Sequence, residues 1–64
     1  MARRIKFRDA YGQEAVAIFG AKYGEWRVTF LRGRGSYTRT CRSLPMVRRI
    51  LDANGYEWTE VERG

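Results

Sequence analysis

Alternation of polar and apolar residues predicts four strands before the only proline of the chain. Near the N-terminus, Ile5 and Phe7 alternate with cationic residues, a pattern typical of a half-buried strand. Residues 14–19 are apolar on both faces, which indicates a central strand. Residues 25–31 alternate cleanly, and residues 36–42 are rich in Tyr and Thr, as strands are. Short turns containing glycine separate these segments, so we expect an antiparallel meander.

A helical pattern begins at Ser43, which is a good N-cap residue. Pro45 falls in the first turn, where its missing N–H costs nothing. Apolar residues then recur at helical spacing and predict an amphipathic helix of about three turns. Asn54 and Gly55 predict the C-terminus of this helix, because both tolerate the left-handed conformation. Residues 56–61 alternate again and predict a final strand.

The predicted element order is β-β-β-β-α-β, which is an α+β fold in which one α-helix packs on a small antiparallel meander. We find no repeat, low-complexity tract or linker, and expect residues 1–64 to form a single basic α+β domain. The position of the last strand within the sheet stays open. A chain of this size buries only about 60% of its unfolded surface, so a homodimer would add buried area.

The large apolar side chains of the predicted strands indicate which face of the sheet the helix covers. We expect the core to contain Ile5, Phe7, Val16, Ile18, Trp26, Val28 and Phe30. The opposite face would then carry Arg4, Lys6, Arg8, Arg27, Thr29, Thr38, Thr40 and Arg42, with Phe19 among them. Trp26 and Trp58 are expected to be core aromatics, because each lies in an alternating segment.

Charge divides the chain into two unequal parts. The formal net charge is +6, from 13 Lys and Arg residues against 7 acidic residues. Residues 1–49 carry twelve of the cations and three of the acids, and residues 50–64 carry one cation and four acids. A basic surface with an acidic end indicates an anionic partner.

Arginine, lysine and threonine on one sheet face predict a nucleic-acid interface, because guanidinium and hydroxyl groups are the usual partners of phosphate. An aromatic residue such as Phe19 would offer a stacking surface, and the basic turn at residues 32–35 would follow a phosphate backbone. The candidate binding residues are Arg4, Lys6, Arg8, Arg27, Arg34, Arg39 and Arg42. Whether the nucleic acid is DNA or RNA stays open.

A purely structural interpretation explains the same residues. Solvated strand faces carry polar side chains in any case, and Thr in particular favours strands. The glycines of residues 32–35 suit a hairpin tip that needs φ > 0. On the helix, Arg48 and Arg49 both lie within reach of Asp52 as ordinary surface ion pairs.

A third interpretation gives the basic surface an acidic protein as its partner. In this alternative the chain is a small phage or mobile-element accessory protein. It would bind and inhibit a host protein complex, such as a nucleic-acid-processing or defence machine. The absence of a catalytic motif and the two-signed charge distribution favour it.

The residue types of this chain argue against a catalytic site and against a metal site. Histidine is absent and Cys41 is the only cysteine, so neither an intrachain disulfide nor a Cys/His zinc site can form. No carboxylate pair, P-loop or dinucleotide-binding glycine motif stands out, and we expect no enzyme and no cofactor. Cys41 is expected to be a small strand residue whose thiol pKa Arg39 and Arg42 would lower.

No apolar run approaches the roughly 20 residues of a membrane span. The basic N-terminus is not followed by the apolar segment of a secretory signal. We therefore expect a cytoplasmic protein with no membrane partner.

One part of the pattern resembles a known family of modules. Residues 26–30, a glycine turn, residues 37–40 and a capped helix are similar to the sheet-plus-helix DNA-binding modules of tyrosine recombinases. The likeness is one of pattern, and the leading strand pair and the strand after the helix depart from it. The small archaeal chromatin proteins of the SH3-like type end on their helix, whereas residues 56–61 follow here, so we reject that match.

Overall fold

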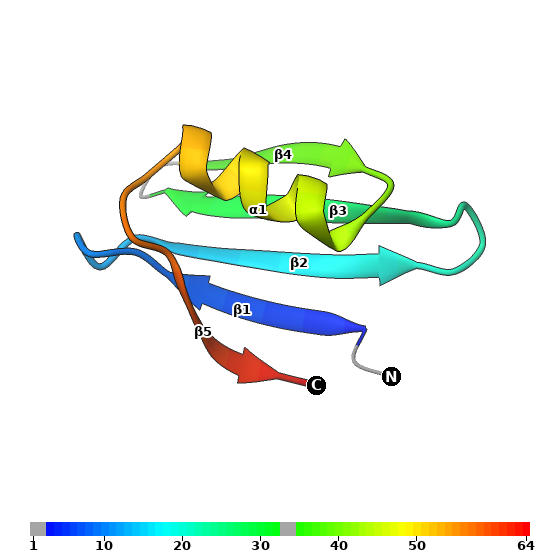
Figure 1. The fold of residues 1–64 in the computed structure, drawn as a ribbon, viewed down its shortest axis with the longest axis horizontal. Helices are drawn as coiled ribbons and strands as arrows, with labels where there is room; N and C mark the ends of the chain where they lie inside the picture. Colours follow the sequence, from blue (N-terminus) through cyan, green and yellow to red (C-terminus); the bar gives the residue numbers. More distant parts are fainter. Residues whose placement is uncertain (1–2, 33–34) are drawn as a thin grey trace.

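The computed structural model describes residues 3–32 and 35–64, and these form one helix and five strands (Figure 1). The elements are β1 (Arg4–Arg8), β2 (Glu14–Gly20), β3 (Glu25–Arg32), β4 (Gly35–Cys41), α1 (Leu44–Ala53) and β5 (Thr59–Arg63). The predicted α+β class and the order β-β-β-β-α-β are confirmed.

The strands form one open antiparallel sheet with the order β4-β3-β2-β1-β5. β2 is the middle strand, as its apolar residues on both faces predicted. β5 pairs with the free side of β1, which the sequence had left open, and a bulge interrupts this pairing between Lys6 and Phe7. β4 and β5 therefore form the two edges of the sheet.

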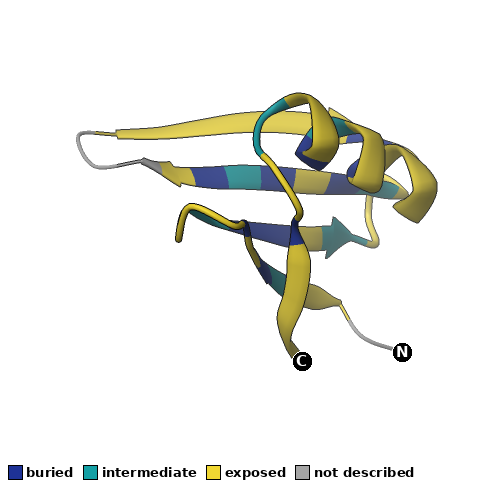
Figure 2. Cartoon of the chain, turned by 60° about the vertical axis from the view of Figure 1, so that its left-hand side comes forward, coloured by how far each residue is buried: buried dark blue, intermediate teal, exposed yellow. Residues whose placement is uncertain are grey.

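The helix lies across β3 and β4 and covers one face of the sheet only (Figure 1). Directly paired residues of antiparallel strands share a face, so the register identifies the side chains beneath the helix. Val47 and Leu51 point from the helix into this layer, and Trp58 joins it from the connection to β5. The buried cluster contains Ile5, Phe7, Ala15, Ala17, Trp26, Val28, Phe30, Cys41, Val47, Leu51 and Trp58. β3 accordingly alternates between buried and less buried residues, whereas β4 is exposed along nearly its whole length (Figure 2).

The orientation of β2 is opposite to the prediction. Ala15 pairs with both Phe7 and Phe30, so the alanines of β2 face the helix side and are fully buried. Val16 and Ile18 consequently lie on the helix-free face. Small side chains in the middle strand leave volume for the aromatic residues of the neighbouring strands. The prediction assigned the larger apolar residues of β2 to the core and did not consider this shared volume.

Phe19 is also on the helix side, contrary to the expectation that it lies among the cations. It pairs with Trp26 in the register, and the two ring centroids are 5.3 Å apart. Phe19 therefore contributes to the edge of the core and offers no stacking surface on the opposite face.

The helix begins as predicted. Ser43 has extended backbone angles, and its hydroxyl accepts a hydrogen bond from the Met46 N–H at 3.4 Å, with Pro45 in the first turn. At the other end, Asn54 donates its backbone N–H to Leu51 and its side-chain amide to the Ile50 carbonyl. The helix thus ends where expected.

The prediction that Asn54 and Gly55 end the helix by adopting the left-handed conformation was wrong. Asn54 has φ −123°, and the left-handed residue after the helix is Glu57, with φ 52°. The left-handed turn at Glu57 redirects the chain, so β5 begins at Thr59, three residues later than the predicted strand. Trp58 precedes the strand and is 1% exposed.

Trp58 is a core aromatic, as predicted, and its indole packs edge-on against Phe30 with centroids 5.8 Å apart. Gly55 also lies against the indole. A Cβ atom on Gly55 would lie 2.5 Å from the indole Nε1 and 2.7 Å from Cε2. The backbone at residue 55 therefore approaches the indole so closely that only glycine fits there, and the Gly55 Cα helps to enclose the ring.

We predict that Gly55→Ala lowers the free energy of unfolding by about 1–3 kcal/mol, because the added methyl group must displace the buried indole. Urea denaturation followed by Trp fluorescence measures this change. Gly20→Ala is the control, since its Cβ would lie no closer than 3.7 Å to the nearest atom, the Glu25 carbonyl oxygen. Equal midpoints for the two variants would contradict the proposed contact.

Candidate nucleic-acid interface

Four of the predicted binding residues lie together on the helix-free face of the sheet. Arg4, Lys6 and Arg8 come from β1, and Arg27 comes from β3. The register places Arg4 beside Ile18 and Ile18 beside Arg27, so the two arginines are separated by one strand. At the usual strand spacing their Cα atoms are about 10 Å apart.

Hydroxyl groups continue this face toward the β4 edge. Thr29 pairs with Thr38, their Oγ1 atoms are 3.2 Å apart, and Thr40 pairs with Arg27. The face therefore carries cations over β1 and β3, an apolar strip over β2 and hydroxyls over β3 and β4. This segregation of residue types follows from the pairing of the strands and is not visible in any one segment.

Each of the four cations has a carboxylate partner. Glu62 accepts a hydrogen bond from Arg4 at 3.1 Å, and Glu25 lies 4.0 Å from Arg27. A single oxygen of Glu14, Oε2, lies 2.8 Å from Arg8 and 3.4 Å from Lys6. The helix-free face therefore places three carboxylates beside these four cations, which the strand pattern did not predict.

The arginines of these ion pairs are about half exposed or more, whereas the side chains of Lys6 and Glu14 are 26% and 29% exposed. The Arg4 side chain is 48% exposed and that of Glu62 is 60% exposed. Ion pairs of this kind contribute about 0–1 kcal/mol, because water screens the attraction and both side chains lose freedom. A phosphate group can therefore replace a carboxylate at small cost, and the pairing does not remove the cations from use.

The pairing at Glu14 is the tightest of the set. Hydrogen bonds from Arg8 and then Lys6 hold the pKa of the Glu14 carboxyl below its usual value of 4.5. Glu14 pairs with Arg8 in the register, and Lys6 is two residues from Arg8 on the same face. The carboxylate thus lies between two cations and keeps them close together.

The remaining predicted binding residues are elsewhere. Arg39 alternates with Thr38 and Thr40 and therefore lies on the helix side of β4, where it donates a 2.7 Å hydrogen bond to the Tyr37 hydroxyl. Arg42 is exposed in the bend between β4 and α1. Arg34 lies outside the described residues. The structure thus assembles four of the seven candidates on one face.

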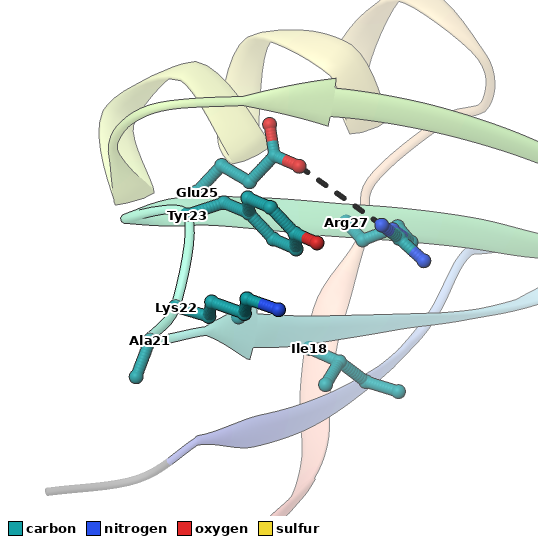
Figure 3. Close-up of a pocket in the computed structure, with 7 residues that line it drawn as sticks. Ile18, Ala21, Lys22, Tyr23, Glu25 and Arg27 are labelled. Carbon is teal, nitrogen blue, oxygen red and sulfur yellow. Dashed lines mark ion pairs between the residues drawn. The ribbon is translucent and has the colours of Figure 1, made fainter.

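An aromatic residue that the sequence analysis did not select lies at one end of the helix-free face. Tyr23, in the β2–β3 turn, is 63% exposed and borders a hollow of about 330 Å³ (Figure 3). Ile18, Lys22 and Arg27 line the same hollow, and the Lys22 ammonium is 5.5 Å from the centre of the Tyr23 ring. In the sequence, Tyr23 lies in a turn between Gly20 and Gly24. A large aromatic residue in such a turn, outside the strands that form the core, indicates an exposed ring.

Cys41 is a small strand residue at the end of β4, as predicted, but the expected lowering of its pKa is wrong. Its side chain is buried beneath the helix beside Trp26, and burial raises the pKa of the thiol. Arg39 and Arg42 do not lower it, and the thiol donates a weak hydrogen bond to the Ser43 carbonyl, at 3.6 Å, for which it must be protonated. Cys41 is therefore a core residue and not a reactive thiol.

Within residues 3–32 and 35–64, no group of three or more His, Cys, Asp or Glu residues is arranged to hold a metal ion. The described part of the chain also has no helix that is both long and apolar enough to cross a membrane. No protein-family model, curated protein or solved structure matches this chain.

We predict that Glu14 stabilises the fold at neutral pH and loses this effect in acid. A carboxyl whose pKa is lowered in the folded state contributes stability above its unfolded pKa, and the contribution disappears as the pH falls through the folded value. The free energy of unfolding of Glu14→Gln should therefore lie below that of the parent protein at pH 7 and approach it below pH 4.5. Urea denaturation at both pH values measures the difference, and a difference that grows in acid would contradict the assigned pairing.

Proposed function

We propose that this protein binds nucleic acid through the helix-free face of its sheet and catalyses no reaction on it. The observation that carries the proposal is that the helix covers one face only. The other face presents four cations from β1 and β3, hydroxyls from β3 and β4, and the exposed ring of Tyr23. Phosphate groups take such guanidinium, ammonium and hydroxyl donors.

The face can bind in either of two ways. A sheet with one open face can enter a major groove, or it can present a platform to single strands. Arg4 and Arg27, separated by one strand, would contact successive phosphates, and the Tyr23 ring would stack on a base. The exposed Ile18 between the two arginines would contact the apolar part of a sugar or base.

The three carboxylates of the helix-free face should lower the affinity of the proposed binding. Glu14, Glu25 and Glu62 occupy the cations in the free protein, and phosphate must displace them. Binding would therefore be weaker than the number of cations implies, and it would fall steeply with salt, because bound cations release condensed counterions from the nucleic acid. We also propose that the protein acts in the cytoplasm.

Fluorescence anisotropy with labelled duplex and single-stranded oligonucleotides tests the proposal at low and moderate salt. Arg27→Gln should weaken binding about two- to tenfold and reduce the slope of log K against log salt by about one contact. Arg48→Gln is the matched control, because Arg48 is on the helix and pairs with Asp52 there. Absence of binding at low salt, or equal losses in the two variants, would refute the proposal.

Removal of a carboxylate from the face should have the opposite effect. Glu14→Gln frees Arg8 and Lys6 and removes one negative charge that repels phosphate, so affinity at low salt should rise about two- to tenfold. Asp52→Asn makes the same change of charge on the helix and serves as the control. An equal gain in both variants would show that total charge decides binding and that the face does not.

A further inference from the structure

β4 is an edge strand with one side unpaired. Within the described residues it pairs only with β3, so the N–H and C=O groups along its other side have no partner strand. Six of its seven residues are exposed, and the strand contains no proline. An edge of this kind is a template for a further strand.

A groove runs between this strand and the helix. It has a volume of about 440 Å³, and its lining includes Tyr37 and Arg39 from β4 and Met46, Arg49 and Ile50 from α1. Tyr37 is 40% exposed and Met46 is 47% exposed, so apolar surface lies open beside the unpaired edge. The groove therefore combines an apolar lining with a row of backbone donors and acceptors.

The cations of this groove differ from those of the helix-free face. Arg39 is held against Tyr37, with a 2.7 Å hydrogen bond to the hydroxyl and the guanidinium carbon 5.9 Å from the ring centre. Among the described residues neither Arg39 nor Arg49 forms an ion pair with a carboxylate, and no acidic residue lines the groove. Two uncompensated positive charges beside an open edge favour an acidic occupant.

We propose that this groove binds an extended acidic segment of another protein, which adds to the sheet as a strand beside β4. Its backbone would pair with the open edge, and alternate side chains would point into the groove. Carboxylates at those positions would meet Arg39 and Arg49, and the methylene groups of the same side chains would contact Met46 and Ile50. The site is on the opposite face from the proposed nucleic-acid surface and does not depend on it.

The alternatives fit the groove less well. Pairing of β4 with β4 of a second copy would bring Arg39 and Arg49 of both molecules together without neutralising charge. β5 of a second copy would bring Glu60 and Glu62, but Arg63 and Arg4 lie beside them and would come with them, so little net negative charge would reach the groove. Such a contact would also leave an open edge at each end and grow without closure. Nucleic acid would satisfy the arginines but not the row of backbone groups.

The test uses two fluorescein-labelled peptides of about ten residues, one alternating Glu with Val and the other alternating Lys with Val. The Glu peptide should bind saturably and the Lys peptide should not. Arg39→Gln and Arg49→Gln should each weaken the Glu peptide about three- to fivefold. Arg48→Gln, on the same helix but paired with Asp52, is the control and should leave the affinity unchanged. Circular dichroism and urea midpoints confirm that each variant is folded.

Amide hydrogen exchange distinguishes strand addition from simple charge attraction. The Glu peptide should slow exchange in β4 and leave the amides of β1 unchanged. Arg27→Gln, which tests the nucleic-acid face, should not alter peptide binding, so the two proposals fail separately. The groove proposal is overturned by no peptide binding, by binding without protection of β4, by an oligonucleotide that protects β4 in place of the peptide, or by a homodimer that buries β4.

Discussion

The fit of two alanines in the middle strand between larger neighbours decides which face of this sheet becomes the core. Ala15 and Ala17 are fully buried, and Ala15 lies in register between Phe7 and Phe30. Their small side chains leave room beneath the helix for Phe30 and Trp58 to pack edge to face. Val16 and Ile18 of the same strand are then directed to the other side, since side chains alternate along a strand.

Two kinds of cation result from this arrangement. Those on the helix-free face come close to carboxylates of neighbouring strands, because pairing brings Glu14 beside Arg8 and Glu62 near Arg4. Arg39, in the groove beside β4, has no acidic neighbour across the sheet, since β4 is at the edge and its partner strand β3 offers Val28 opposite Arg39. The net charge of +6 is therefore less informative than the position of each strand in the sheet.

Local signals in the sequence predicted the elements well. The hydroxyl of Ser43 and the proline that follows identify the start of the helix, because both act within a single turn. The last strand begins later than predicted. Glu57 is left-handed, and Trp58 is buried against Gly55 and the core, a contact that no local pattern contains. The sequence analysis did not select Tyr23 for a related reason. An aromatic residue in a turn can be identified as exposed only when the residues that form the core are known.

The sequence alone determined the number, type and order of the elements, and the middle position of a strand that is apolar on both faces. These properties depend on side-chain periodicity and on capping, which act over a few neighbouring residues. Only the tertiary structure decided which face of β2 joins the core, where β5 pairs, and which cations have carboxylate partners. Those outcomes depend on the volume shared between strands and on a register between residues as far apart as Lys6 and Glu62, so they exist only after the chain has folded.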